Sequence, residues 1–354
     1  MNDWREKLLK WYEANKRDLP WRSIKDPYKI WLSEVILQQT RVNQGWEYYV
    51  RFIEKYPTVK DLANAPEQDV LKLWQGLGYY SRARNLHFAA KSILKEHKGK
   101  FPSDYKSIRN LKGVGDYTAG AIASIAFDLQ HPAVDGNVMR VYSRLFGITT
   151  PVDSTEGKKK IFETAVELLP AKNPGTYNQA VMELGAMVCL PAKPDCINCP
   201  IQDGCYAFAN KSVSGFPVKE VKTKVRNRYL NYLVITHGDR LLLRIRKEKD
   251  IWQGLHDFPM LESNKSIIEP KFLKDKKWEE IIHISKPIIK DVSEEYAHIL
   301  SHQKLFARFY KLEATSKITK LPKDCFWIKT KDIEKYAVPR LIDIYIRRKL
   351  VLTP

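Results

Sequence analysis

Four cysteines lie close together in the sequence, and cysteine thiolates are strong metal ligands. Cys189, Cys196, Cys199 and Cys205 form the pattern C-x6-C-x2-C-x5-C, and the fifth cysteine, Cys325, lies far downstream. Zinc sites usually combine two short Cys-x2-Cys pairs, whereas this segment has one, so the spacing favours a cubane iron–sulfur cluster over zinc. In a reducing compartment such a cluster of cysteines indicates a metal site rather than a disulfide framework.

Glu34 lies in the segment Ser33–Arg41, which is expected to be helical. Its neighbours at helical spacing are the apolar residues Ile30, Trp31 and Leu37. A glutamate on an apolar stripe is costly unless it is paired or protonated, and burial raises its pKa. A general acid that works near neutral pH needs this property. The residues alone also allow a partly exposed glutamate at a helix edge.

A second carboxylate, Asp135, precedes a short helical pattern. It belongs to the motif VDGNV at 134–138, and the helix is expected over Met139–Phe146. Asp135 is predicted to be the N-cap of this helix. A carboxylate that is fixed at a cap can also face a cleft, so the two roles are compatible.

Two glycines separated by one apolar residue open another helix. Gly113 and Gly115 lie in the segment Leu111–Ala119 (LKGVGDYTA), before the apolar stretch Ala121–Phe127. This arrangement lets backbone N–H groups approach an anion closely, as in the helix-hairpin-helix turn that grips a DNA phosphate. Taken alone, the pattern also fits a plain connection between helices.

The elements that must position these residues fall into two regions, and the first, residues 1–210, carries helix signals. Asp26-Pro27 predicts an N-cap followed by a proline in the first turn of the helix that contains Glu34. Further helices are expected over 67–75, 81–97, 117–127, 137–146, 158–169 and 176–188. No long stretch alternates with period two, so this region is predicted to be all-α.

The pattern changes after Lys211. Residues 211–228 are rich in basic side chains and lack an amphipathic period, which predicts an interdomain linker. The triplet His237-Gly238-Asp239 then has the chemistry of a hairpin turn. Strands are expected over Leu230–Thr236, Arg240–Arg246 and Gln303–Leu312, and a terminal helix over Arg340–Leu350. Residues 229–354 are therefore predicted to form an α/β or α+β domain.

Composition narrows the class of protein. The 354 residues contain 60 Lys and Arg against 41 Asp and Glu, a net charge of +19, which favours a polyanionic partner. The hydrophobic fraction of 44% is that of a globular chain and argues against a disordered or collagen-like protein. The charged N-terminus and the lack of an apolar run of about 18 residues predict a cytoplasmic protein without a signal peptide or a membrane contact.

The motifs together resemble a known family. The hairpin glycines, then VDGNV, then the four cysteines, in this order, resemble the endonuclease III superfamily of DNA glycosylases. Where its lyase branch carries a Schiff-base lysine, this chain has Tyr117. The segments Pro20–Arg22 (PWR), 33–42 (SEVILQQTRV) and Gly76–Ala83 (GLGYYSRA) are similar to the MutY family of adenine glycosylases. The resemblance covers essentially the whole chain, because that family also has a Nudix-like C-terminal domain.

The resemblance implies a function and roles for particular residues. The family excises adenine mispaired with 8-oxoguanine or guanine, after the adenine has been flipped out of the duplex. By similarity, Glu34 protonates the adenine and Asp135 stabilises the oxocarbenium-like sugar, as in other glycoside hydrolyses. Tyr117 and Asn137 match positions that orient the sugar, the water and Asp135. The cysteines match the ligands of a [4Fe-4S] cluster.

Further positions match the family's contacts with the base and the duplex. The positions that line the family's adenine pocket are matched here by Trp21, Arg22 and Gln179. The positions that fill or wedge the duplex beside the flipped base are matched by Gln39, Leu77, Gly78 and Tyr79. The hairpin glycines Gly113 and Gly115 match the phosphate-binding turn. From the residues alone, the pair Tyr79-Tyr80 also fits a helix C-terminus with packed aromatic rings.

The second region resembles Nudix domains at Trp252–Pro259 (WQGLHDFP). The Nudix catalytic box is absent downstream of Gly254, which argues against phosphoanhydride hydrolysis. The family's recognition loop reads Phe-Ser-His, and this chain has Leu300-Ser301-His302. By similarity, Ser301, with His302 beside it, contacts the 8-oxoguanine. Leucine at position 300 keeps an apolar wedge but removes the aromatic ring.

These observations predict a multidomain protein with three parts. Residues 1–210 form an all-α glycosylase domain, with the helix-hairpin-helix at about 108–127 and the cluster loop at 189–205. Residues 211–228 are the linker, and 229–354 form an α+β Nudix-like domain for 8-oxoguanine recognition. We expect a monomer associated with the nucleoid. Two other classes stay open: a bifunctional thymine-glycol-type glycosylase with lyase activity, and a non-enzymatic iron–sulfur protein that binds DNA or senses redox state.

Overall fold

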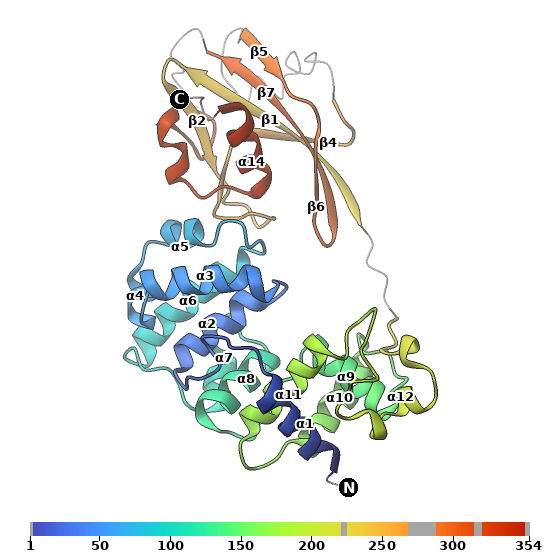
Figure 1. The fold of residues 1–354 in the computed structure, drawn as a ribbon. Helices are drawn as coiled ribbons and strands as arrows, with labels where there is room; N and C mark the ends of the chain where they lie inside the picture. The colour runs from blue at the N-terminus through green and yellow to red at the C-terminus, as the bar shows by residue number, and fades with distance from the viewer. Residues whose placement is uncertain (1–2, 221–224, 268–287, 315–320, 351–354) are drawn as a thin grey trace. The chain divides into compact units, whose positions relative to one another are not determined.

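The computed structural model describes residues 3–220, 225–267, 288–314 and 321–350. The chain divides into two compact units (Figure 1). One comprises Met1–Asn64 and Asn85–Lys222, and the other comprises Ala65–Arg84 and Thr223–Pro354. The segment Ala65–Arg84 thus groups with the C-terminal unit, although sequence reasoning placed it with the helices of residues 1–210. The two units are described separately below.

Helices dominate the chain up to residue 209. The α-helices are α1 (Asp3–Asn15), α2 (Pro27–Leu37), α3 (Val42–Lys55), α4 (Val59–Asn64), α5 (Glu67–Leu73), α6 (Ser81–Glu96), α7 (Tyr105–Asn110), α8 (Asp116–Phe127), α9 (Gly136–Phe146), α10 (Thr155–Leu168), α11 (Pro174–Met187) and α12 (Tyr206–Ala209). Short 3-10 turns lie on either side of α12, with η1 (Gln202–Gly204) before it and η2 (Val213–Gly215) after it. Every helix predicted in this region is present, with shifts of a few residues at the ends.

Side-chain caps fix the helices that carry the carboxylates. The carboxylate of Asp26 accepts hydrogen bonds from the backbone N–H groups of Tyr28 and Lys29, so the predicted cap of α2 is confirmed. Asp135 caps α9 in the same way. Gly147 ends α9 with a φ of 62°, in the left-handed region that favours glycine. The caps therefore fix the backbone at the start of α2, which carries Glu34, and at the start of α9, where Asp135 lies.

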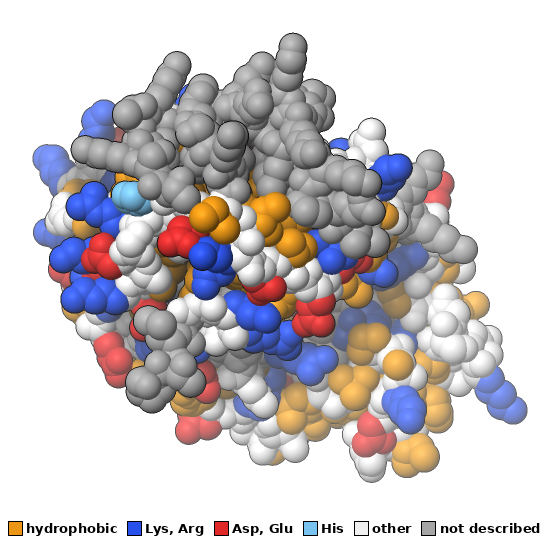
Figure 2. Space-filling model, turned by 90° about the horizontal axis from the view of Figure 1, so that it is seen from above, with side chains coloured by type: hydrophobic (Ala, Val, Ile, Leu, Met, Phe, Trp, Pro, Cys, Tyr) orange, Lys and Arg blue, Asp and Glu red, His pale blue; other side chains and the backbone are white. Residues whose placement is uncertain are grey.

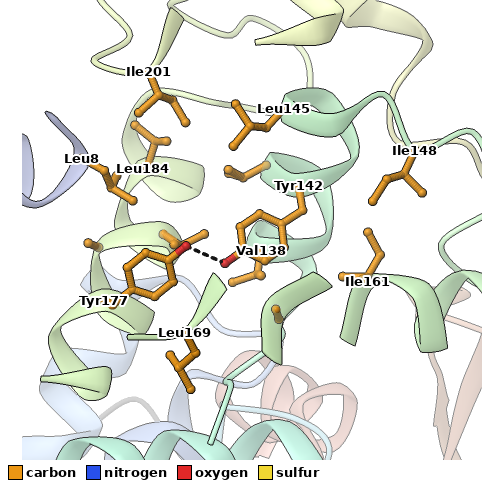
Figure 3. Packing of buried hydrophobic residues seen from close by; sticks show 14 of the residues in the cluster. Leu8, Val138, Tyr142, Leu145, Ile148, Ile161, Leu169, Tyr177, Leu184 and Ile201 are labelled. Atoms are coloured by element: carbon orange, nitrogen blue, oxygen red, sulfur yellow. Dashed lines mark hydrogen bonds between the residues drawn. The ribbon is translucent and has the colours of Figure 1, made fainter. Parts of the chain in front are cut away.

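A buried core joins α1, α9, α10 and α11 (Figure 3). Tyr142 on α9 and Tyr177 on α11 face each other there, and their hydroxyl groups are 3.2 Å apart in a hydrogen bond. Cys189, Cys199 and Cys205 pack against the same core. The segment with the cysteines is thus anchored to α9, which Asp135 caps, and to α11, which carries Gln179.

The C-terminal unit is built on a mixed sheet. Its strands are β1 (Arg226–His237), β2 (Arg240–Ile245), β3 (His256–Asp257), β4 (Met260–Ser263), β5 (Ile288–Val292), β6 (Tyr296–Ile299), β7 (Gln303–Glu313) and β8 (Cys325–Lys329). The main path runs β3-β2-β1-β7-β5, with β4 on β1, β6 on β7 and β8 on β2. The central pair, β1 and β7, is parallel, and the other pairs are antiparallel.

The hairpin between β1 and β2 forms as predicted, because His237 pairs with Arg240 and Gly238 has a φ of 58°. A 3-10 turn, η4 (Thr330–Lys335), precedes the terminal helix, which is α14 (Arg340–Tyr345) continued by a π-helical turn, η5 (Ile346–Leu350). The ring of Tyr345 stacks on Phe309 of β7, with ring centroids 3.9 Å apart. This contact places α14 against the sheet.

The segment predicted to be a linker, residues 211–228, overlaps the first strand. β1 begins at Arg226, so the last three residues of that segment belong to the sheet. Arg228 forms ion pairs with Asp250 and Glu262, and these partners draw the basic end of the segment into the sheet. Residues 221–224 of the predicted linker lie outside the described residues.

The surface shows mixed chemistry on the face in Figure 2, where Lys and Arg side chains alternate with acidic and hydrophobic ones. In that view the excess of basic residues is not gathered into one uniform patch. Among the described residues, no helix has the length and apolarity that a membrane span requires.

Candidate functional site

A cavity of about 400 Å³ lies among the helices of the first unit. It brings together eight of the residues singled out in the sequence: Trp21, Arg22, Glu34, Gln39, Tyr117, Asp135, Asn137 and Gln179. They come from the segment before α2, from α2 and the turn after it, from the start of α8, from the start of α9 and from α11. Residues more than 150 positions apart in the sequence therefore meet in one cavity.

Glu34 lies on α2 and lines this cavity. Burial raises the pKa of Glu34 to about 7, and the negative charge of Asp135 adds to this effect. The hydroxyl group of Tyr117 donates a hydrogen bond to Glu34 Oε2, which together with the charge of Arg22 counteracts the rise. Glu34 can therefore hold a proton near neutral pH.

Asp135 is held differently. Its Oδ1 accepts hydrogen bonds from the backbone N–H groups of Asn137 and Val138, both 2.8 Å long, and its Oδ2 accepts one of 2.6 Å from the amide of Asn137. Burial raises the pKa of Asp135, whereas these hydrogen bonds favour the carboxylate form. The two carboxyl groups in one cavity thus have environments that suit an acid at Glu34 and an anion at Asp135.

Aromatic and polar groups complete the cavity wall. Trp21 is buried and packs edge to face on Tyr49, with ring centroids 4.9 Å apart. Gln39 follows the end of α2 with a φ of 59°, a left-handed conformation that is strained for a residue other than glycine. Strained backbone conformations of this kind are often found at binding and catalytic sites.

Sequence reasoning missed two residues that line this cavity and one that lies behind its wall. Glu183 and Arg17 line it, and Tyr12, which does not, joins Gln179 to Arg22. Glu183 follows Gln179 by four positions on α11, so the two share a helix face. That spacing was the available signal, but a glutamate four residues after a glutamine is too common to stand out.

The four predicted metal ligands lie around a second, smaller cavity. Cys189, Cys196, Cys199 and Cys205 all line it, and none of them forms a disulfide. Within the described ranges, no group of three or more metal-binding side chains is close enough to hold a single ion. The cysteines are thus four partly buried thiols arranged around one space.

Two buried arginines on α9 contact the segment that carries the cysteines. Arg144 Nη1 lies 3.2 Å from Cys189 Sγ and donates to the carbonyl oxygen of Leu190. Arg140 donates through Nε to the carbonyl of Cys189 and through Nη2 to the side-chain oxygen of Asn137. These contacts connect the cysteine segment physically with the group that holds Asp135.

The hairpin glycines line neither cavity but shape the turn before α8. Gly113 has a φ of 81°, and a Cβ atom there would lie 2.6 Å from Asn85 Cβ, so only glycine fits. Gly115 is the N-cap of α8, and no side chain caps this helix end. The turn therefore presents a helix N-terminus with room for an anion.

A separate cavity of about 390 Å³ lies within the C-terminal unit. It brings together the remaining residues singled out in the sequence: Leu77, Gly78, Tyr79, Ser301 and His302. The Tyr79 hydroxyl forms a hydrogen bond with Ser301 Oγ. Tyr79 is 45% exposed with a φ of 46°, whereas Leu77 is buried. Segments 222 positions apart in the sequence thus meet at this contact.

The loop with Ser301 is held from both ends. It connects β6 to β7, and Leu300 donates its backbone N–H to the carbonyl of Gln303. Arg228 donates to the side chain of Gln303 and forms two hydrogen bonds with Asp250, which lines the same cavity. Sequence reasoning did not identify Arg228 or Asp250.

Family models match both predicted domains. Residues 32–171 match the HhH-GPD superfamily of base excision DNA repair proteins, and residues 231–348 match the NUDIX domain. These matches confirm the predicted fold class, a helical helix-hairpin-helix domain followed by a Nudix-like domain with a mixed sheet.

Solved structures of DNA glycosylases share the fold of the helical region. A thermostable thymine-DNA glycosylase is 29% identical, with a TM-score of 0.54, and the match covers 59% of this chain and 98% of that one. Endonuclease III in a non-covalent DNA complex is 22% identical, with a TM-score of 0.51 over 58% of this chain and 94% of that one. The second match shows the fold alone.

Curated relatives identify the family. The adenine DNA glycosylase of Buchnera aphidicola from Acyrthosiphon pisum is 36% identical over 76% of this chain and 77% of its own length. The adenine DNA glycosylase of Rattus norvegicus is 35% identical over 87% of this chain and 70% of its own length. These matches confirm the resemblance stated from the motifs. The chain therefore belongs to the adenine DNA glycosylase family.

Proposed function

We propose that this protein is a monofunctional DNA glycosylase that excises adenine mispaired with 8-oxoguanine or guanine, as part of base excision repair. The observation that carries this proposal is the pair of carboxyl groups in the first cavity. Glu34 has a pKa raised to about 7, and Asp135 accepts three hydrogen bonds that favour its anion. Hydrolysis of a glycosidic bond needs this combination of an acid and an anion.

The acid acts on the base. An adenine flipped out of the duplex enters the cavity, where protonated Glu34 donates its proton to a ring nitrogen. The protonated base is a better leaving group, so the bond between the base and the sugar breaks with its electrons moving onto the adenine. Tyr117, which donates to Glu34 Oε2, keeps the carboxyl group oriented during this step.

The anion acts on the sugar. Positive charge develops there as the base leaves, and the fixed Asp135 carboxylate stabilises it. Asn137 holds Asp135 through its backbone and side-chain N–H groups. A water molecule then adds to the sugar carbon that lost the base, and its extra proton passes to the Glu34 carboxylate, which restores the acid. The cavity has Tyr117 at the position where the lyase branch carries lysine, so no Schiff base forms and the DNA strand stays intact.

Contacts with the duplex come from three places. The uncapped N-terminus of α8, behind Gly113 and Gly115, binds a backbone phosphate through its N–H groups. Gln39 and Tyr79 both have left-handed φ angles and exposed side chains, which suits residues that fill the space left by a flipped base. Trp21, Arg22 and Gln179 line the cavity that receives the adenine.

Recognition of the opposite base belongs to the cavity that contains Ser301. Ser301 and His302 are exposed on the β6–β7 loop, and Leu77, Gly78 and Tyr79 line the same space. In this proposal Ser301 and the backbone beside it form hydrogen bonds with 8-oxoguanine. Leu300 supplies an apolar contact in place of an aromatic ring.

The four cysteines fit a [4Fe-4S] cluster. Four thiols line one cavity, and a cubane cluster needs four thiolates. The group would be held by Cys189, Cys196, Cys199 and Cys205, and it would supply a rigid cross-link for a segment rich in loops. Metal analysis should find about four irons per chain, and stoichiometric zinc without iron would contradict this assignment.

The substrate is double-stranded DNA, and the net charge of +19 supports a polyanionic partner. We expect the protein to act as a monomer on DNA in the cytoplasm, at the nucleoid, without a membrane contact. Light scattering with and without a mismatched duplex checks the stoichiometry.

One assay tests the function directly. Duplexes with A opposite 8-oxoguanine, A opposite G, and C opposite 8-oxoguanine are incubated with excess protein, and free adenine and strand cuts are measured before and after alkali. We expect adenine release from the first two duplexes and strand cuts only after alkali. Cuts without alkali would favour the bifunctional lyase, and binding without adenine release would favour the non-enzymatic protein.

A further inference from the structure

Two arginines and one glutamate form a buried ionic group in the wall of the first cavity. The side chain of Glu183 is fully buried, whereas those of Arg17 and Arg22 are 33% and 12% exposed. Burial of an unpaired carboxylate is costly, so its partners must satisfy it. They do: the net effect of the hydrogen bonds from both arginines, against the opposing effect of burial, is to lower the pKa of Glu183.

The geometry of this group is specific. Glu183 Oε1 accepts hydrogen bonds of 2.9 Å from the backbone N–H and from Nε of Arg17. Glu183 Oε2 accepts bonds of 2.5 Å from Nη2 of Arg17 and from Nη2 of Arg22. One carboxylate thus fixes two guanidinium groups that both line the cavity.

The group extends to a third polar side chain. Arg22 Nη1 lies 3.5 Å from the Tyr12 hydroxyl, and that hydroxyl lies 3.3 Å from Gln179 Oε1. A guanidinium only donates, so the Tyr12 oxygen accepts from Arg22, and its one proton points to Gln179. The side-chain oxygen of Gln179 is therefore turned toward Tyr12. The side-chain NH2 group is left to donate hydrogen bonds into the cavity.

We propose that Glu183 is a positioning residue of the adenine pocket, which holds Arg17 and Arg22 and, through Arg22 and Tyr12, orients the Gln179 amide as a donor to the base. This inference rests on the proposed function and deepens it. Glu183 touches no reacting atom. It sets the shape, the hydrogen-bonding polarity and the charge of the wall that faces the base.

The net charge of this ionic group affects the pKa of Glu34. Two cations and one anion leave this wall with one positive charge, and Arg22 lowers the pKa of Glu34. The other groups that face Glu34 are Tyr117 from α8 and Asp135 at the start of α9. Replacing Glu183 by glutamine leaves the wall with two positive charges. Replacing Arg17 by glutamine leaves it neutral.

The two substitutions should therefore shift the titration of Glu34 in opposite directions. Arg22 lowers the pKa of Glu34, and Glu183 offsets the positive charge of the wall that contains Arg22. We therefore expect Glu183→Gln to lower the pKa of Glu34 and Arg17→Gln, which removes a positive charge from the same wall, to raise it by a smaller amount. A role in packing alone would produce no shift, or shifts of the same sign.

Two readouts follow this titration. The first is carboxyl NMR of the full-length protein with labelled glutamate, in which the Glu34 signal is identified by its loss in Glu34→Gln. The second is the pH profile of single-turnover adenine release. The control is Glu163→Gln on α10, which removes the same charge from an exposed pair with Lys159. It should change neither readout.

The outcomes separate this proposal from the proposed function. Opposite shifts in the NMR titration support the positioning role even if the wild-type protein releases no adenine, which would overturn the proposed function alone. Adenine release by the wild type with unshifted titrations in both variants would overturn the positioning role alone. If Glu183→Gln does not fold, Arg17→Gln decides by itself: a raised pKa supports the proposal and an unchanged pKa overturns it.

Discussion

The cavity at Glu34 and the cavity at Ser301 hold their polar groups in different ways. In the first, the carboxyl groups are enclosed by helices, and burial, nearby charges and hydrogen bonds shift their pKa values. In the second, Ser301 and His302 are exposed on a loop between two strands. Tyr79, which meets Ser301 there, is also exposed and has a left-handed backbone.

This difference matches two kinds of task. Proton transfer requires a pKa moved toward neutrality, and burial, nearby charges and hydrogen bonds inside a cavity can move it. Discrimination between two bases requires hydrogen-bonding groups that reach into DNA, and exposed groups on a held loop can do so. Substitutions in the first cavity should therefore change the rate on every substrate, and substitutions in the second should change the ratio between substrates.

The largest expected effect comes from removing the proton donor. Glu34→Gln keeps the shape of the side chain but cannot deliver a proton, so adenine release should fall by about 100- to 10,000-fold. The loss should be equal for A opposite 8-oxoguanine and A opposite G, and duplex affinity should persist through phosphate contacts. Single-turnover excision and gel-shift binding measure the two properties, with Glu163→Gln as the control. A loss confined to one duplex would contradict the separation of tasks.

The pH dependence of release should also belong to the first cavity. Since the pKa of Glu34 is raised to about 7, the donor is protonated below this pH and loses its proton above it. The single-turnover rate should fall about tenfold per unit of pH well above 7. Tyr117→Phe removes a hydrogen bond that lowers this pKa, so its alkaline limb should move to higher pH. Ser301→Ala should leave the limb where it is, and a shift there would show that the two cavities are not independent.

Sequence patterns predicted the helices of the first cavity well, because local signals determine them. The cap at Asp26 and the cap at Asp135 each satisfy backbone groups within three residues. The partners of Glu183 could not be read in the same way. Arg17 and Arg22 reach it across more than 160 positions, and only the packing of α1 and α11 brings them together.

The strands were harder to predict than the helices. The hairpin at Gly238 was predicted because its turn chemistry is local, and β7 was predicted from its alternation. The shorter strands, such as β3 at His256–Asp257 and β6 at Tyr296–Ile299, have too few residues to show a period. The contact between Tyr79 and Ser301 joins two segments whose link exists only in the fold.

A smaller effect is expected from Ser301→Ala. Loss of the hydroxyl group removes one hydrogen bond to the lesion, and base discrimination of this type is worth about 1–3 kcal/mol. His302 and nearby backbone groups remain, so the preference for A opposite 8-oxoguanine over A opposite G should fall by about fivefold, the equivalent of about 1 kcal/mol. The rate on A opposite G should not change. If the ratio of the two rates is unaltered, the loop does not read the lesion.

The smallest expected effect comes from Tyr79→Phe, which removes only the hydroxyl group that meets Ser301. The aromatic ring at position 79 is kept in this variant. Its contact with the Arg82 guanidinium, which lies 5.6 Å from the centroid of the Tyr79 ring, is kept as well. Because both residues are exposed, water replaces much of the lost bond, and the ratio of the two excision rates should fall by about twofold.

The double variant of Tyr79→Phe with Ser301→Ala tests how the Tyr79 hydroxyl acts. If the hydroxyl acts by orienting Ser301, it has no further role once Ser301 is alanine, so the double variant should match Ser301→Ala alone. Additive losses would mean that Tyr79 contacts the DNA independently, and an equal loss on both duplexes would move Tyr79 from lesion recognition to general DNA positioning.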